Sequence, residues 1–373
     1  MIADVPGLMP HESTPAAYFR SGFVAVVGRP NVGKSTLVNA MVGSKVSIMS
    51  SRPNTTRHDI RGILHRQDAQ VVFVDTPGMH RPRSPLGERL NDKAGAILGD
   101  VDVILVVVDA TAPVGPGDHR VLEQVLARLR REEVEDHGDV EDHAGDLPGD
   151  AGLDTVIAGT DSAGRRAEAV DSRVLVVVNK IDRARPEQVL ISLATVDEVV
   201  RKILGGRGGA HDAARDATVR DATAQDDAAG DTGVELFPVS AATGAGVGAL
   251  VSAVVDRLPF GPRYFPKDMV TDLPEAVRVA ELVREQILAR VRDELPHSVA
   301  CQVTEWEWPR IRCEIIVERE SQKAIVIGRG AEHLKAAGIA VRQELPPGAF
   351  LDLHVHVERH WQRRKDLLDR FGY

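Results

Sequence analysis

The sequence predicts an α/β domain with helices on both faces of a mostly parallel sheet, followed by a smaller α+β domain. From residue 23 to about residue 259, short apolar runs alternate with amphipathic stretches, as they do in doubly wound sheets. The first apolar run leads into a glycine-rich turn, GRPNVGKS, at residues 28–35, and this turn predicts that the α/β domain is of the Ras-like P-loop nucleoside-triphosphatase class. After residue 275 the order changes to a helix, expected over residues 275–295, then two strands, a helix and a strand, which indicates a second module.

Apolar runs rich in valine and isoleucine mark the expected strands. They show no alternation of polar and apolar residues, which is typical of strands covered on both faces. The runs are residues 23–28, 70–75, 101–109, 173–179 and 234–240, and a further strand at 60–66 is expected at the edge. The expected helices lie near residues 34–44, 85–98, 117–130, 186–204 and 246–258.

Two acidic segments interrupt this alternation. Residues 131–172 hold thirteen Asp and Glu against three Arg, and residues 205–233 hold six Asp against three Arg. Because they contain few large apolar residues, they cannot bury enough surface to offset the entropy lost on ordering. We expect disordered insertions in a nucleotide-binding domain of residues 21–259, which follows an N-terminal extension of residues 1–20. The alternative is that they mimic nucleic acid and regulate binding.

Charge and composition limit the class of protein. The net charge is −9; the two acidic segments carry −10 and −3, and the rest of the chain carries +4. The two cysteines, Cys301 and Cys313, are expected to be buried thiols in a reducing compartment. No secretory signal is apparent, and the longest apolar stretch, residues 103–110, is too short to span a membrane. We therefore expect a soluble protein of the cytoplasm.

The turn at residues 28–35 has the spacing of a phosphate loop. Gly28 and Gly33 allow backbone amides to approach a β-phosphate, Lys34 is expected to bind the β and γ oxygens, and Ser35 is expected to ligate Mg²⁺. The residues of this loop that we assign to nucleotide binding are Gly28, Asn31, Val32, Gly33, Lys34, Ser35 and Thr36.

The sequence DTPG, residues 75–78, ends the second buried run. Asp75 is expected to hold Mg²⁺ through water, and the Gly78 amide is expected to sense the γ-phosphate. Between the two motifs lie Thr55 and Thr56. We favour Thr56 as a metal ligand when GTP is bound; the alternative is that both threonines only solvate a loop. The catalytic assignment is Lys34, Thr56, Asp75 and Gly78.

The sequence NKID, residues 179–182, predicts a guanine site. A desolvated Asp182 would accept from the ring N–H and the exocyclic amine of guanine, and adenine lacks this arrangement. Lys180 is expected to lie along the base, and Asn179 is expected to tie the loops together. The sequence SAATG follows the last apolar run and contributes Ser240, Ala241 and Ala242, with the Ala241 amide facing the guanine carbonyl.

These motifs resemble those of the Era GTPases of bacteria, within the wider Era/TrmE/Der group. GRPNVGKSTLVNA, PNTTR, DTPGMH, NKID and SAATG carry the resemblance in the first domain, and FPKDMVTDLPE, DELPHSV, VERESQKAIVIG and FGY carry it later in the chain. The resemblance implies GTP and GDP with Mg²⁺, a linker at residues 260–275, and a type II KH domain at residues 276–373. It also implies binding to small-subunit (16S) ribosomal RNA and maturation of the small ribosomal subunit.

Two positions bear on the rate of hydrolysis. Met79 follows Gly78 where Ras-type GTPases place a glutamine, so intrinsic turnover should be slow. His80 could substitute, but a surface histidine is the alternative that we favour. In the wider group an asparagine in the phosphate loop is tied to activation by potassium, so the resemblance implies K⁺ at Asn31 as a further hypothesis.

The stretch VIGRGAEHLKAAG, residues 326–338, occupies the place of the KH loop that clamps the nucleic-acid backbone. The expected clamp is Gly328, Arg329, Gly330 and Ala331, with alanine in place of the final glycine, and we expect alanine to be acceptable there as part of the first helical turn. Lys323 and Lys335 complete the RNA-binding assignment. Trp361 is expected either to stack on a base or to lie partly buried under a basic face.

The leading hypothesis is a monomeric GTPase that binds ribosomal RNA, and not DNA, and assists assembly of the small subunit. One alternative is a GTPase switch that acts on a protein or membrane partner in cell-cycle or stress signalling, with peripheral association at the inner face of the membrane. Another is an RNA-binding protein that has lost hydrolysis. The complete set of Lys34, Ser35, Asp75 and Asp182 argues against this last alternative.

Overall fold

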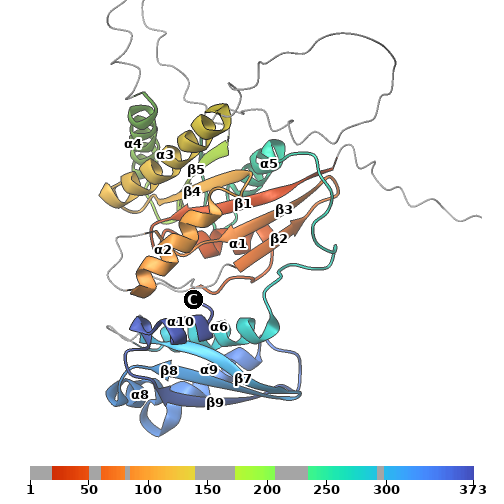
Figure 1. The fold of residues 1–373 in the computed structure, drawn as a ribbon, viewed down its shortest axis with the longest axis vertical. Coiled ribbons are helices and arrows are strands. Elements are labelled where there is room, and N and C mark those ends of the chain that lie inside the picture. The colour runs from red at the N-terminus through yellow and green to blue at the C-terminus, as the bar shows by residue number, and fades with distance from the viewer. Residues whose placement is uncertain (1–18, 50–59, 80–84, 139–172, 206–233, 292–297) are drawn as a thin grey trace, which may run out of the picture.

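The computed structural model describes residues 19–49, 60–79, 85–138, 173–205, 234–291 and 298–373. In the view of Figure 1 they form two bodies, with the larger N-terminal domain above the smaller C-terminal domain. Thr55, Thr56 and His80 lie outside the described residues, as does most of the two acidic segments.

A six-stranded sheet forms the centre of the first domain, in the order β2-β3-β1-β4-β5-β6. Only β2 runs antiparallel, at the edge, as expected. The mostly parallel sheet predicted from the apolar runs is confirmed. The strands are β1 (Arg20–Gly28), β2 (Ile60–His65), β3 (Ala69–Asp75), β4 (Val103–Asp109), β5 (Val174–Asn179) and β6 (Glu235–Pro238).

Helices cover both faces of this sheet (Figure 1). Strand β1 shows why its sequence lacks polar alternation: Val24 and Val26 pack into one hydrophobic cluster, while Ala25 and Val27 pack into another on the opposite face. Helices α1 and α5 contribute to the first cluster, and α2, α3 and α4 contribute to the second. The helices are α1 (Lys34–Val42), α2 (Pro85–Ile97), α3 (Pro116–Gly138), α4 (Pro186–Gly205) and α5 (Val247–Arg257).

Three predicted boundaries differ from the structure. Helix α3 continues to Gly138, into the segment expected to be disordered from residue 131, since the stretch RREEVE consists mainly of Arg and Glu, which favour helix. Strand β1 begins at Arg20, inside the expected extension. The helix expected over residues 275–295 ends at Leu288, where the Arg290 guanidinium donates to the Gln286 carbonyl at 2.7 Å and so binds one of the terminal carbonyls.

The second domain is built on a mixed three-stranded sheet in the order β7-β8-β9. Strand β7 is antiparallel to β8, and β9 is parallel to β8. Helices α6, α8 and α9 pack on one face, whereas α10 and α2 of the first domain contribute to a cluster on the other face. The elements are α6 (Glu275–Leu288), β7 (Ala300–Glu307), β8 (Arg310–Val317), α8 (Glu320–Ile327), η4 (Arg329–Ala331), α9 (Glu332–Arg342), β9 (Phe350–Val357), η5 (Trp361–Arg363) and α10 (Lys365–Arg370).

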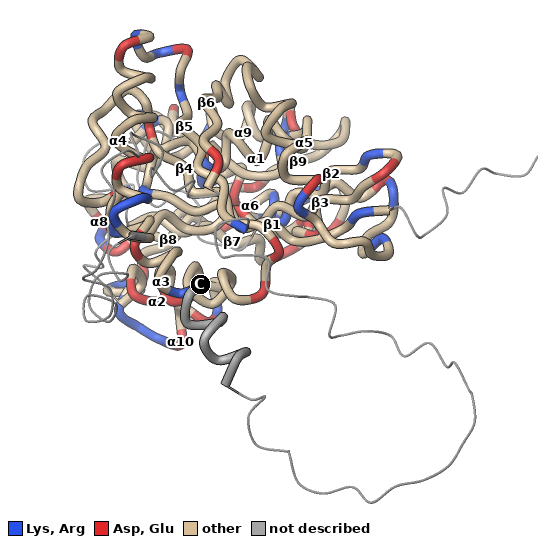
Figure 2. The backbone as a smooth tube through the Cα atoms, turned by 90° about the horizontal axis from the view of Figure 1, so that it is seen from above, with Lys and Arg blue, Asp and Glu red and all other residues tan. Residues whose placement is uncertain are grey.

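The segment between the domains lies along the edge of the large sheet. The Gln70 side chain donates to the Phe265 carbonyl at 2.8 Å, and His65 Nε2 lies 2.8 Å from the Met269 carbonyl oxygen. Arg61 on β2 forms an ion pair of 2.6 Å with Asp272. Figure 2 shows acidic and basic residues interspersed along the described elements of both domains. The overall distribution of charge therefore does not mark an RNA-binding surface, and such a surface has to be identified from the residues around the KH loop.

Candidate nucleotide and RNA sites

The phosphate loop follows β1 and ends at the start of α1. At Gly33, with φ +100°, an added Cβ would lie 2.4 Å from Asn179 Nδ2; at Gly28 it would lie 2.4 Å from the Val107 carbonyl oxygen. A Cβ at Gly28 would collide with the backbone of β4, and one at Gly33 would collide with the Asn179 side chain. Asn31 adopts φ +67°, which asparagine tolerates better than most residues. The tight loop therefore requires glycine at the two positions predicted from sequence.

Lys34 is buried and folds back over its own loop. Its ammonium donates to the carbonyl oxygens of Gly28, at 3.1 Å, and Arg29, at 3.0 Å. Burial lowers the pKa of Lys34 to about 8, and the nearby charge of Asp75 acts in the opposite direction. Phosphate oxygens would add negative charge beside this ammonium, so nucleotide binding should favour its protonated form.

The DTPG turn packs directly against the phosphate loop. Asp75 is buried at the end of β3, and the Thr76 hydroxyl donates to the Val26 carbonyl at 2.8 Å. The Met79 amide donates to the Gly28 carbonyl at 3.1 Å. At Gly78 an added Cβ would lie 2.8 Å from Pro30 N, so the approach requires glycine. This contact brings the predicted metal residue Asp75 close to the loop that carries Ser35.

The residues fit a magnesium–nucleotide complex. A hydroxyl and a carboxylate are the hard oxygen ligands that Mg²⁺ prefers, together with phosphate oxygens and water. Ser35 is the second residue of α1, and Asp75 ends the neighbouring strand β3. Met79 is buried in the core of the sheet, so its side chain cannot orient a water molecule. The expected metal ligand Thr56 and the alternative water-positioning residue His80 lie outside the described residues.

Asn179 links the phosphate loop to the guanine-reading loops. Its Nδ2 donates to the Val32 carbonyl at 2.9 Å, and its Oδ1 accepts from the Ala241 amide at 3.0 Å. The side chain is buried. The prediction that Asn179 ties the loops together is confirmed, whereas the Ala241 amide assigned to guanine is bonded to Asn179 in this structure.

Lys180 and Asp182 are each held by a neighbouring side chain. Lys180 adopts φ +68°, and its ammonium contacts Asp109 Oδ2 at 2.6 Å and the Asn31 carbonyl at 2.5 Å. Asp182 Oδ1 accepts from the buried Ser240 hydroxyl at 2.6 Å. Ser240 therefore orients the carboxylate expected to read guanine.

Asp109 is a residue of this site that the sequence motifs did not reveal. It ends β4 directly opposite Asn179 in the β4–β5 register. Burial raises its pKa, but hydrogen bonds from Lys180 and Thr111 outweigh burial and hold the pKa below its ordinary value. An ionised Asp109 thus holds the Lys180 ammonium in place. The sequence signal that could have revealed Asp109 is its position at the carboxyl end of a buried parallel strand.

The candidate RNA clamp has an unusual backbone at its alanine. Gly328 and Gly330 adopt φ +75° and +59°, and Ala331 adopts φ +62° and ψ +29°, immediately before α9 begins. The expectation that Ala331 belongs to the first helical turn is wrong, because it adopts the left-handed conformation instead. This conformation brings the Cβ of an L-residue close to the following carbonyl oxygen.

We expect Ala331→Gly to stabilise the chain by about 1 kcal/mol, because the left-handed conformation costs an L-residue about that much. The free energy of unfolding from denaturant titration would measure the gain. Ala336→Gly, inside α9, is the matched control and should destabilise by about 1 kcal/mol. Equal losses in the two variants would contradict the left-handed assignment. Tighter RNA binding by Ala331→Gly would further show that alanine weakens the clamp.

The surface around this loop carries basic and apolar groups. Arg329, Gly330 and Lys335 are exposed, and Lys323 is half-buried. Ile325, near the end of α8, is 46% exposed, and Glu332 at the start of α9 is exposed as well. An apolar side chain beside a loop that carries basic groups suits an unstacked base above a held backbone.

Trp361 does not belong to this surface. Its side chain is fully buried, and its indole N–H donates to the Ser298 carbonyl at 3.0 Å. The ring contacts the rings of Phe371 and Tyr373, with centroids 5.6 and 5.8 Å away. The expectation that Trp361 stacks on a base is therefore wrong. The alternative expectation was partial burial, and the side chain is in fact fully buried. The basic sequence around it concealed a core residue.

Known proteins match both domains. Residues 23–136 match the family model described as 50S ribosome-binding GTPase, and residues 294–362 match the KH domain model. The chain is 38% identical to the GTPase Era of Mycolicibacterium paratuberculosis over 366 residues, covering 95% of this chain and 99% of the relative. The GTPase Era of Mycobacterium tuberculosis is 38% identical over 367 residues, with the same coverage.

Two solved structures share the whole architecture. One is Aquifex aeolicus Era bound to GDP and AlF4⁻, with 31% identity, and the other is Era in complex with MgGDPNP and nucleotides 1506–1542 of 16S ribosomal RNA, with 32% identity. Each gives a TM-score of 0.69 and covers 95% of this chain and 99% of the other.

Proposed function

Because the chain belongs to the Era family of GTPases, we propose that it couples GTP hydrolysis to the binding of 16S ribosomal RNA through its KH domain, and so assists maturation of the small ribosomal subunit. One observation carries the proposal: a phosphate loop joined through Asn179 to a guanine-reading loop is followed in the same chain by a KH fold with a basic loop. The relative that is complexed with a 16S segment supports the choice of RNA.

The residues of the nucleotide site have distinct roles in this reaction. Lys34 would bind the β and γ oxygens, and Ser35, Asp75 and Thr56 would hold Mg²⁺. The metal ion would supply positive charge that offsets the negative charge of the phosphates. Asp182, oriented by Ser240, selects guanine. Because the Met79 side chain is buried, it cannot orient the attacking water, and we expect slow intrinsic turnover.

We expect potassium to accelerate hydrolysis. Asn31 lies in the phosphate loop with φ +67°, and its carbonyl accepts from Lys180. A monovalent cation at this loop would add positive charge where negative charge develops in the transition state. Steady-state rates in potassium and sodium buffers of equal ionic strength measure the effect, and Asn31→Ala should remove it. Equal rates in the two buffers would contradict the hypothesis.

A GTPase switch acting mainly on a protein or membrane partner is the less favoured function, because this chain matches the KH domain model and a solved relative that it resembles over nearly its whole length is in complex with 16S ribosomal RNA. Within the described residues, no helix has the length and apolar character needed to cross a membrane. We propose a monomer acting in the cytoplasm, with peripheral membrane association left as a separate hypothesis. DNA is not among the proposed partners.

Crosslinking in cells, followed by sequencing of the bound RNA, tests the proposed function. We expect wild-type protein to recover a discrete segment of small-subunit rRNA. The double variant Arg329→Glu with Lys335→Glu should lose it, because both side chains are exposed beside the KH loop. Lys202→Glu, an exposed basic residue on α4, is the matched control and should retain it. Recovery of protein partners without rRNA would favour the alternative function.

A further inference from the structure

Lys180 is held at both ends of its side chain, although it lies in the loop between β5 and α4. At the backbone end, the amide of the next residue, Ile181, donates to the Val239 carbonyl at 3.2 Å. At the other end, the ammonium donates to the Asn31 carbonyl at 2.5 Å and to Asp109 Oδ2 at 2.6 Å. The Lys180 side chain therefore links the guanine-reading loop to the phosphate loop and to the end of β4.

The carboxylate of Asp109 is itself oriented by the residue two positions later. Asp109 Oδ1 accepts from the Thr111 amide at 2.9 Å and from the Thr111 hydroxyl at 2.6 Å. The Ala110 amide, between these two residues, donates to the Asn179 carbonyl at 2.9 Å and so fixes this turn against the residue that precedes Lys180. Each carboxylate oxygen thus has its own partner, and the protein alone sets the direction in which Asp109 faces the ammonium.

The Asp109–Lys180 pair is shielded from solvent more than the Asp197–Arg201 pair on α4. The side chains of the first pair are 16% and 24% exposed, and those of the second are 38% and 44% exposed. Water screens exposed pairs, which contribute little, whereas removing one member of a shielded pair leaves the other charge uncompensated. Lys180 also adopts a left-handed φ of +68°, and such a conformation persists in a lysine only where its surroundings fix it.

We propose that Asp109 is a positioning residue for guanine-nucleotide binding, which acts by holding the Lys180 side chain in place for the base. This inference rests on the proposed function of the site, in which Lys180 lies along the base. Without the Asp109 carboxylate, the flexible lysine stem would regain rotamers that nucleotide binding then has to remove. Because Lys180 is assigned to the base and not to the γ-phosphate, GTP and GDP should lose affinity alike.

Nucleotide binding to the full chain tests the proposal. Asp109→Asn keeps the size of the side chain but removes its charge, and the dissociation constants of fluorescent GDP and GTP should both rise about tenfold, the effect of one lost hydrogen bond to a charged group. The preference for GTP over XTP should stay unchanged, because it is assigned to Asp182. An unchanged affinity for both nucleotides in Asp109→Asn would overturn the proposal, as would a loss confined to GTP.

Thr111→Val perturbs the same carboxylate without removing either charge. It deletes the hydroxyl that donates to Asp109 Oδ1 and keeps the backbone amide that does so as well. Affinity for GDP and GTP should fall about threefold, the effect of one neutral hydrogen bond. The unfolding midpoint verifies that each variant folds. If Asp109→Asn lowers that midpoint, Thr111→Val decides the question, and wild-type affinity in Thr111→Val would then contradict the role of Asp109.

A double-mutant cycle shows whether Asp109 acts through Lys180. Lys180→Met removes the ammonium and keeps an apolar stem. In that background Asp109→Asn should change affinity by less than about twofold, the range within which independent effects add, because no ammonium remains to be held. If the full loss seen in Asp109→Asn also appears in the Lys180→Met background, Asp109 does not act through Lys180 and the proposal fails.

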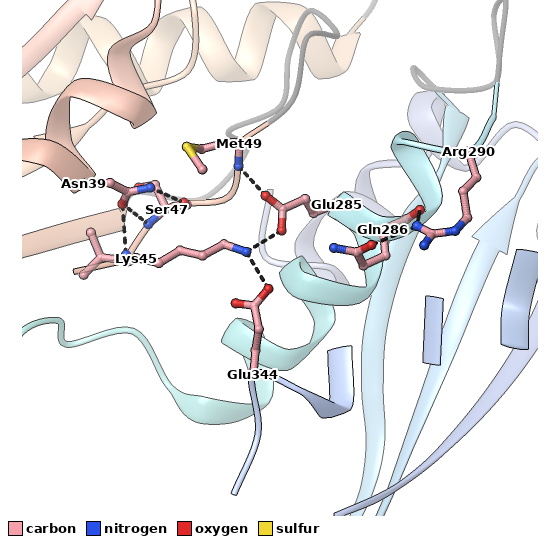
Figure 3. Close-up of polar contacts among 9 residues, drawn as sticks. Asn39, Lys45, Ser47, Met49, Glu285, Gln286, Arg290 and Glu344 are labelled. Carbon is pink, nitrogen blue, oxygen red and sulfur yellow. Dashed lines mark hydrogen bonds and ion pairs between the residues drawn. The ribbon is translucent and has the colours of Figure 1, made fainter. Parts of the chain in front are cut away.

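Glu344→Gln is the matched control, because it weakens another partly buried contact between a lysine and a carboxylate. The Lys45 ammonium donates to Glu344 Oε1 at 2.7 Å. Glu285 on α6 accepts from the same ammonium and from the Met49 amide, each at 2.7 Å, so this cluster joins the two domains (Figure 3). Affinity for GDP and GTP should match wild type. A loss equal to that of Asp109→Asn would attribute the effect to general loosening of the chain and overturn the proposal.

The wild-type chain separates this inference from the proposed function. If wild type binds no guanine nucleotide, the proposed function fails. If wild type binds GDP and GTP and Asp109→Asn binds them equally well, only the role of Asp109 is contradicted.

Discussion

Replacing Asp182 with asparagine is expected to change the base specificity of the site from guanine to xanthine. The carboxylate accepts from the ring N–H and the exocyclic amine of guanine. Asparagine offers one acceptor and one donor, so its amide would face the guanine amine as donor to donor. The sequence predicts a desolvated Asp182, whereas the side chain is exposed in this structure, so the bound base itself would have to cover it. Sites that hydrogen-bond their ligand in this way reject a mismatched one by about 10⁴-fold, and we expect GTP affinity to fall by about that factor. Xanthine carries an oxygen where guanine carries the exocyclic amine, so the variant should bind XTP instead of GTP.

Calorimetric titration with GTP and XTP measures this exchange. Ser240 donates to Asp182 Oδ1 at 2.6 Å, so Ser240→Ala is the matched control: it loosens the carboxylate but leaves its chemistry unchanged. We expect Ser240→Ala to weaken GTP about tenfold, the effect of one lost hydrogen bond to a charged group, with no gain for XTP. If Asp182→Asn weakens both nucleotides equally, Asp182 does not read the base.

The sequence predicts the sheet well, and it predicts where the phosphate loop needs glycine, because both depend on short-range patterns. In β1, consecutive apolar residues such as Ala25 and Val26 pack into clusters on opposite faces of the sheet, so strand burial follows directly from an unbroken apolar run. The phosphate loop needs glycine at positions where a Cβ would lie 2.4 Å from a neighbouring atom. Such requirements fix the spacing of the glycines in the sequence motif. Asp75 and Asn179 each end a parallel strand, so both lie at the same edge of the sheet.

Other features depend on partners that a local pattern does not contain. Trp361 lies in a basic stretch, yet its indole is satisfied by Ser298, 63 residues earlier in the chain. The contact of Glu285 with Met49 joins two domains, and neither residue belongs to a motif. At Ala331 the sequence shows an ordinary helix-favouring residue, and only the backbone reveals the left-handed conformation. Long-range packing determines each of these features, so periodicity and motif spacing could not predict them.

Replacing Lys34 with alanine is expected to lower kcat for GTP by at least about a hundredfold, the loss typical when one preorganised group that stabilises the transition state is removed. The ammonium lies within the loop, 3.1 Å from the Gly28 carbonyl oxygen, and interacts with the charge of Asp75. Without it, the β and γ oxygens face the buried Asp75 with less positive charge to offset their repulsion. Affinity for GTP should fall more than affinity for GDP, because GDP lacks the γ-phosphate.

Lys34→Met separates charge from shape, since methionine fills similar volume without an ammonium. If charge is the cause, both variants should lose hydrolysis to a similar extent, whereas a methionine variant close to wild type would assign the effect to packing. Neither should unfold the domain. Burial lowers the pKa of Lys34 to about 8, so burial disfavours the charged form, and a neutral side chain of similar volume is not expected to lower the free energy of unfolding. Loss of hydrolysis in Lys34→Met with an unfolding midpoint that is unchanged or higher would therefore place Lys34 in the reaction itself and outside the stability of the fold.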